Sequence, residues 1–249
     1  MLMQKRPIGT IAYVGRGSNA EDFTWAWSQL VQYTFEHLSM FCNPEKETIY
    51  VLRGSRSGQY FTRNWLAQAQ LGDWVLMLDN DHTFEPDLLW RMLRVFNRPD
   101  FPIDVLCGLY QYRGSPYNPV LYHYDEKVEG YVHITHQATT EPLQIGRIGA
   151  AGGGHLMVRR RVFDRIRDEM KQKPFNPYDP WGEDFAFFER LRVLGIPVWC
   201  CPDIQSYHLR VEETTMEDFD PRLVKALMDV QCPGSPPPLM QPEPPEMWP

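Results

Sequence analysis

The stretch Trp74–Pro86, which reads WVLMLDNDHTFEP, constrains most strongly what this chain can fold into. Trp74–Leu78 is an apolar run of the length of a strand buried on both faces, and it stops abruptly at Asp79. Such strands occur in parallel sheets that helices cover on both sides, and ligands bind at their carboxyl ends. The sequence therefore predicts an α/β domain with a site at the end of this strand.

Asp79 and Asp81 are separated by one residue, so in extended chain their carboxylates project to the same side of the strand. Such a pair can hold Mg²⁺ or Mn²⁺, which usually keeps few protein carboxylates and takes other ligands from water and substrate phosphates. The alternative is ordinary turn and helix-cap chemistry, with Pro86 downstream. These residues alone do not separate the two interpretations.

The preceding segments alternate between strand and helix patterns. Ile8–Val14 and Thr48–Leu52 are predicted strands, and Ala20–Phe35 and Phe61–Gln70 are predicted helices. A β-α-β-α-β order implies right-handed crossovers and a largely parallel sheet. The carboxyl ends of these strands therefore share one edge of the sheet with Asp79.

Three arginines are expected near that edge. Arg16 and Arg53 follow the first and second strands, and Arg63 lies in the second helix. Their guanidinium groups are suited to pairing with a diphosphate or stacking on a base. The alternative, which is stronger for any one of them, is a plain surface arginine.

The second half of the chain adds core elements and a change of character. A helix with an apolar stripe follows Pro86, and Ile103–Tyr110 is a predicted strand. Gln111–Leu143 contains tyrosine-rich, alternating segments separated by turn residues. We interpret it as a small antiparallel excursion with a long loop laid over the sheet.

Glycines are concentrated at Gly146–Gly154, which reads GRIGAAGGG and leads into the short apolar strand His155–Val158. Three consecutive glycines remove side chains where something approaches the backbone closely. A substrate wall is one explanation, and a bulge or hinge is the other.

The second informative stretch is Pro180–Gly195, which reads PWGEDFAFFERLRVLG. Its apolar spacing predicts a helix that Gly195 ends, with Glu183 and Asp184 in the first turn. Acids there can complement the helix dipole, or they can face a substrate beside Trp181. The next predicted strand is Ile196–Cys201, and His208 follows it in a predicted loop.

Composition excludes several classes of protein. The 249-residue chain is 43% hydrophobic, enough for a large core, and its net charge of −7 argues against broad binding to nucleic acid or anionic membranes. An odd count of five cysteines without a CxxC pair indicates neither a disulfide framework nor a zinc knuckle. No signal peptide or membrane span is apparent in the sequence. We expect a soluble, cytoplasmic protein.

The order of these motifs resembles that of GT-A glycosyltransferases, with family 2-like members as the nearest pattern. The likeness covers Ile8–Leu209 and includes the DxD-type Asp79–Asp81, the glycine-rich strand, the WGED sequence and His208. It implies a Rossmann-like α/β fold with a mixed, mostly parallel central sheet flanked by helices. Residues 1–211 are then the catalytic domain, 212–232 a helical segment and 233–249 a proline-rich tail.

The resemblance also implies roles for individual residues. Asp81, His208 and Asp79 correspond to the metal site, with Asp79 also touching the ribose. Asp184 corresponds to the catalytic base and Glu183 to its acceptor-holding neighbour. The predicted nucleotide-binding residues are Val14, Gly15, Arg16, Arg53, Arg63, Asp79 and Asn80. The predicted acceptor- or sugar-binding residues are Gly153, Gly154, Trp181, Gly182 and Glu183.

The implied activity is Mn²⁺- or Mg²⁺-dependent transfer of a hexosyl group from a UDP- or GDP-type donor, with inversion. The acceptor is the hydroxyl of a glycan, a protein or a small molecule. The alternatives are a nucleotidyltransferase acting on a sugar phosphate, a retaining GT-A enzyme and a non-catalytic carbohydrate-binding protein. The GRGS sequence at Gly15–Ser18 departs from the acidic loop common in family 2, and the absence of a QxxRW motif argues against a processive synthase.

Overall fold

The computed structural model describes residues 5–15, 21–54, 58–135 and 146–209. The predicted position of Arg16, the predicted helical segment 212–232 and the predicted tail 233–249 lie outside these ranges. Within them, no helix is long and apolar enough to cross a membrane.

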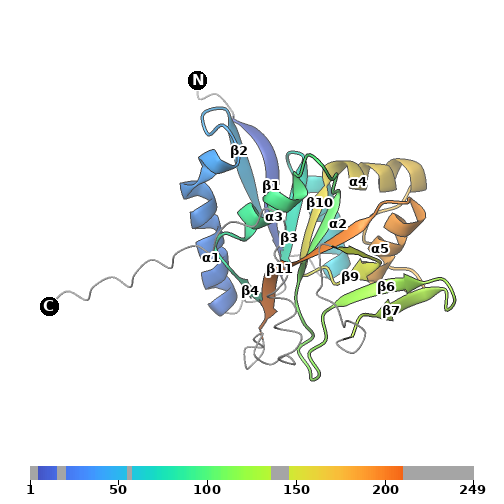
Figure 1. Ribbon diagram of the computed structural model, residues 1–249. Helices are drawn as coiled ribbons and strands as arrows, with labels where there is room; N and C mark the ends of the chain where they lie inside the picture. Colours follow the sequence, from blue (N-terminus) through green and yellow to red (C-terminus); the bar gives the residue numbers. More distant parts are fainter. Residues whose placement is uncertain (1–4, 16–20, 55–57, 136–145, 210–249) are drawn as a thin grey trace.

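The central sheet has the strand order β2-β1-β3-β10-β5-β11-β4, with β8 paired to β11 (Figure 1). Parallel pairing joins β1 to β2 and β3, and β5 to β11, whereas β10 runs antiparallel between β3 and β5. The predicted α/β fold with a mixed, mostly parallel sheet is confirmed. The bounds of these strands are β1 Arg6–Val14, β2 Glu47–Gly54, β3 Trp74–Asp79, β4 His82–Phe84, β5 Val105–Leu109, β8 Gly146–Ile148, β10 His155–Arg159 and β11 Val198–His208.

Helices cover both faces of this sheet, and each face has its own apolar core. Helices α1 (Glu21–Glu36) and α3 (Leu88–Phe96) pack on one face, and α2 (Gln59–Ala69), α4 (Arg160–Arg165) and α5 (Glu183–Val193) pack on the other. Strand β3 contributes Val75 and Met77 to one core and Leu76 and Leu78 to the other. Successive side chains of a strand point to opposite faces, so the apolar run of β3 is buried from both sides.

Smaller elements complete the described part. The strands β6 (Leu121–Asp125), β7 (Gly130–His133) and β9 (Ala150–Ala151) form an antiparallel sheet in the order β7-β6-β9, which confirms the predicted excursion. A 3₁₀ turn at Leu38–Met40 follows α1, and a π-helical turn at Ile166–Met170 continues α4.

Strand β11 is longer than the sequence suggested. The predicted strand ended at Cys201, but β11 continues to His208, so the prediction that His208 lies in a loop was wrong. The register to β5 shifts between Cys201 and Gln205, where Pro202 cannot donate a backbone hydrogen bond. Beyond this irregularity β11 changes partner and pairs with β4, which sets His208 opposite His82.

Candidate functional site

The candidate site lies at the carboxyl end of β3, where the predicted sheet edge is confirmed. Val14 is in register with both Asp79 and Gly54, so the ends of the first three strands meet. The backbone N–H of Asn80 donates to the Val14 carbonyl at 2.9 Å. A Cβ on Gly15 would lie 2.9 Å from the Asn80 side chain. Glycine therefore allows the backbone of residue 15 to lie close to Asn80.

Arg63 joins the two acidic motifs of the sequence. It projects from α2 into the protein, where its side chain is 1% exposed. Its Nη2 donates to both carboxylate oxygens of Asp79, at 2.9 and 3.0 Å. Its Nη1 donates to Asp184 Oδ1 at 2.9 Å and to Glu183 Oε1 at 3.2 Å. Arg63 is thus the cation that holds the end of β3 against the start of α5, rather than a surface arginine.

Burial and charge act against each other in this cluster. Burial raises the pKa of Asp79 to about 6, with Asp81 and Asp184 adding to the shift and Arg63 opposing it. Burial also lowers the pKa of Arg63, but the attraction of Asp184, Asp79 and Glu183 outweighs it and the net shift is upward. Arg63 therefore remains charged, with both Nη atoms bonded to carboxylates, whereas its buried Nε has no hydrogen-bond partner in the described part of the chain.

A second group, formed by Asp81, His82 and His208, has the composition of a metal site. One potential ligand atom of each residue lies within 4.8 Å of the others. Asp81 Oδ1 and His82 Nε2 are 3.6 Å apart, and both atoms are buried without a hydrogen-bond partner in the described part of the chain. Buried polar atoms are normally paired, so a cation between these atoms fits the donor set.

The imidazoles of His82 and His208 are oriented by the contacts of their Nδ1 atoms. His208 Nδ1 contacts the carbonyl of Gln111, which only accepts hydrogen bonds, so Nδ1 carries the proton and Nε2 keeps its lone pair. His82 Nδ1 lies 2.9 Å from Ser206 Oγ. Burial lowers the pKa of His82 well below its usual value and also lowers the pKa of His208. Both rings are therefore neutral near pH 7, the form that ligates metals.

The three consecutive glycines make room for these side chains. A Cβ on Gly152 would lie 1.9 Å from the Tyr110 hydroxyl, and one on Gly153 would lie 2.5 Å from Asp184 Oδ1. A Cβ on Gly154 would lie 2.8 Å from His82 Nε2. Because Gly153 and Gly154 are consecutive, the Arg63 cluster and the metal-type group are immediate neighbours. Site side chains fill this space, and sugar binding by the two glycines stays a prediction.

The remaining predicted residues lie around this centre. Asp79 is outside the metal-type group, with both oxygens bound to Arg63. Arg53 is exposed on β2, its guanidinium carbon 5.8 Å from the centre of the Tyr13 ring. Trp181 stacks on Phe185 at 5.8 Å between ring centroids, and a Cβ on Gly182 would meet nothing within 4 Å.

Sequence reasoning missed the contacts that three side chains make in this site. His82 follows Asp81 directly, and its signal was the alternation of β4, in which His82 and Phe84 are buried and Thr83 is less so. Arg113 forms an ion pair with Asp81 Oδ2. Tyr110 accepts a hydrogen bond from the Gly154 N–H at 3.2 Å and packs against both histidine rings. No sequence pattern marks Arg113, and the tyrosine-rich spacing that includes Tyr110 does not indicate these contacts.

Comparisons with known proteins give a family. The model of the family described as "Glycosyl transferase family 2" matches residues 32–167, more than half of the chain. Among solved structures, the one titled "Crystal Structure of A197 from STIV" is similar at 17% identity and a TM-score of 0.43, covering 81% of this chain and 85% of that one. No curated protein matches significantly. With this match over strands β3 and β10 and their acidic edge, the chain belongs to glycosyl transferase family 2.

Proposed function

We propose that this protein is a metal-dependent glycosyltransferase that moves a hexosyl group from a nucleoside-diphosphate sugar to an acceptor hydroxyl with inversion. The observation that carries the proposal is the contiguity of two groups at one sheet edge. Asp81, His82 and His208 form the metal-type group. Directly beside it, Arg63 holds the carboxylates of Glu183 and Asp184. Metal on a leaving diphosphate and a base for an acceptor hydroxyl are the two needs of this reaction.

Asp81, His82 and His208 would hold the divalent cation, which when bound would neutralise charge on the leaving nucleoside diphosphate. Of the two ions expected from the sequence, we favour Mn²⁺. Two imidazole nitrogens suit a transition metal, whereas Mg²⁺ prefers oxygen ligands. The donor is then a UDP- or GDP-type sugar at the ends of β1 and β3, with Asn80 and Asp79 near its ribose.

Asp184 is our candidate for the catalytic base. Its Oδ1 accepts from Arg63, whereas its Oδ2 has no hydrogen-bond partner within the described residues. Arg63 therefore fixes the carboxylate while one oxygen stays available for the proton of an acceptor hydroxyl. Glu183 precedes Asp184 at the start of α5, and consecutive helical residues point about 100° apart, so we assign Glu183 to holding the acceptor.

We assign the acceptor to an aromatic cluster formed by Tyr131 and by two residues that flank Glu183 in the sequence, Trp181 and Phe185. Trp181, Phe185 and Tyr131 pack together, with 5.2 Å between the ring centroids of Tyr131 and Trp181. Aromatic rings with a polar edge offer apolar contact to a sugar ring together with hydrogen bonding. This arrangement supports a glycan acceptor over a protein or a small molecule.

Thermal shifts and calorimetry with UDP, GDP, UTP and free sugars, each with and without Mn²⁺, test the proposal. We expect UDP or GDP to stabilise the protein only when Mn²⁺ is present. Asp81→Ala should abolish this effect, and Asp168→Ala, which removes an exposed carboxylate elsewhere, should not. Unchanged nucleotide affinity in Asp81→Ala would refute the metal site. A preference for UTP would favour a nucleotidyltransferase, and sugar binding without nucleotide would favour a binding module.

A further inference from the structure

A polar pocket lies at the end of strands β3 and β10 that is opposite the candidate site. In the pairing of β10 with β3, His155 is opposite Leu78 near the candidate site, and Arg159 is opposite Trp74 at the other end. Four residue steps separate these pairs, or roughly 13 Å along the strand. The pocket has a volume of about 560 Å³, within the range of small-molecule sites. Its charged lining residues are Arg98, Arg159, Arg160, Arg161, Asp73 and Asp164.

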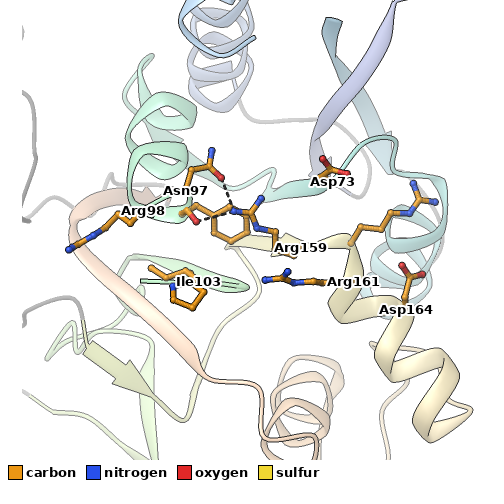
Figure 2. A pocket seen from close by; sticks show the side chains of 10 residues that line it. Asp73, Asn97, Arg98, Ile103, Arg159, Arg161 and Asp164 are labelled. Atoms are coloured by element: carbon orange, nitrogen blue, oxygen red, sulfur yellow. Dashed lines mark hydrogen bonds between the residues drawn. The ribbon is translucent and has the colours of Figure 1, made fainter. Parts of the chain in front are cut away.

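Arg159 brings an unneutralised positive charge to this pocket. Its Nη2 donates to the Phe96 carbonyl at 3.0 Å and to Asn97 Oδ1 at 2.7 Å, and its guanidinium carbon lies 4.2 Å from the Phe96 ring centre. These partners are all neutral. Burial, and next the nearby charge of Arg161, lower the pKa of Arg159, although a guanidinium remains protonated in proteins. Figure 2 shows Arg159 between Asn97 and Arg161.

The other charges around the pocket leave a positive surplus. Arg161 pairs with Asp104, Arg98 pairs with Asp100, and both pairs are partly exposed. Arg160 makes no ion pair within the ranges that the structure describes. Of the two acids in the lining, Asp164 is already paired with Arg167. Asp104 and Asp73 attract Arg159 from beyond ion-pair distance, and Asp73 is the acid of the lining that makes no ion pair in the described ranges. The lining is thus positive in a chain whose net charge is −7.

We propose that this pocket binds a small phosphate-bearing anion, separately from the candidate active site. The planar fork of a guanidinium matches phosphate oxygens, and the Nε and Nη1 of Arg159 make no hydrogen bond to the described residues. Asn97 and Phe96 already hold this side chain, so binding costs less ordering entropy than it would for a free surface arginine. The phosphate belongs either to a soluble metabolite or to a lipid headgroup.

Calorimetry with inorganic pyrophosphate in metal-free buffer tests the proposal. Arg159→Gln and Arg160→Gln should each weaken binding about tenfold or more, because each removes a charge-assisted hydrogen bond. The matched control is Arg165→Gln, which removes an α4 arginine paired with Glu169. Asp73→Asn should strengthen binding, since it removes the acid that opposes the ligand. Circular dichroism checks that each variant is folded.

The outcomes separate this site from the active site. Pyrophosphate binding that is lost in Arg113→Gln but kept in Arg159→Gln and Arg160→Gln would assign the anion to the candidate active site and overturn the proposal. Equal affinity in all variants, or no binding by the wild type, would also overturn it. Flotation with phosphatidic acid vesicles identifies the source, because capture that Arg160→Gln abolishes indicates a lipid headgroup, and binding of pyrophosphate alone indicates a soluble ligand.

Discussion

A fully buried arginine lies at one end of strands β3 and β10 and a half-buried arginine at the other, and their charges are paired differently. At the carboxyl end of β3, Arg63 is 1% exposed and pairs with three carboxylates. At the other end, Arg159 is half-buried and bonds only neutral oxygens. A cation neutralised by carboxylates links elements of the fold, whereas a cation without an ion pair keeps hydrogen-bonding capacity for a ligand. The comparison assigns Arg63 to positioning carboxylates and Arg159 to recognition.

The largest expected effect tests whether chemistry belongs to the Arg63 end alone. Asp184→Asn should lower the transfer rate by a factor of about 10²–10⁴, the usual contribution of a general base, while donor affinity survives. Glu183→Gln should mainly raise the KM for the acceptor. The measurements are the transfer rate and the donor affinity with a nucleoside-diphosphate sugar identified by the binding screen.

The control for this comparison is Arg160→Gln at the opposite edge, which should leave the rate unchanged. Near-normal turnover of Asp184→Asn would move the base elsewhere or point to a retaining mechanism. A rate loss in Arg160→Gln as large as that in Asp184→Asn would show that the two ends do not act separately.

The next effect compares the two arginines by stability. Arg63→Gln leaves Asp79, Glu183 and Asp184 without their cation and should destabilise the fold by about 3–5 kcal/mol, as breaking buried ion pairs does. Arg159→Gln loses hydrogen bonds to neutral partners and should cost about 1–2 kcal/mol. Urea unfolding measures both. Adding Asp79→Asn to Arg63→Gln should recover part of the loss, and a loss that stays unchanged would contradict a charge-based explanation.

The sequence predicted the sheet edge well because its signals are local. The apolar run of β3, the glycine after β1 and the first-turn acids of α5 each report on a few neighbouring residues. The side-chain pairings were not predictable in the same way. The link from Arg63 to Asp184 depends on how α2 and α5 pack on one face of the sheet. His82 meets His208 only because β11 changes partner after Pro202.

The metal-type group should make ligand binding at the candidate site depend on Mn²⁺, whereas anion binding at the Arg159 end should not depend on it. His208→Ala and His82→Ala should each raise the Mn²⁺ concentration needed for nucleotide binding by about tenfold or more, because each removes a ligand nitrogen. The matched control is His123→Ala, which removes an exposed histidine of β6. Titrations of Mn²⁺ against nucleotide binding that coincide for the wild type and His208→Ala would remove His208 from the metal site.

The smallest effect concerns His155, which begins β10 beside the candidate site and is fully buried. A Cβ on Gly108 would lie 2.1 Å from its ring, and both ring nitrogens lack a hydrogen-bond partner in the described part. Burial lowers the pKa of His155 from 6.5 to about 3. Between these values the unfolded chain binds a proton that the folded protein does not, so stability should fall as pH falls below 6.5. One such group contributes a slope of about 1.4 kcal/mol per pH unit.

Unfolding free energies from urea titrations at pH 7.5 and 5.5 measure this slope. His155→Gln removes the titrating ring, so it should lose less stability on acidification than the wild type loses. Asp79 contributes the opposite slope between pH 3.8 and about 6, because its raised pKa makes the folded state bind protons more readily, but it does so in both proteins. The difference between the two slopes therefore isolates His155. Parallel pH profiles would mean that His155 takes up its proton at the same pH in the folded and the unfolded chain. Burial at this end of β10 would then not keep the imidazole neutral.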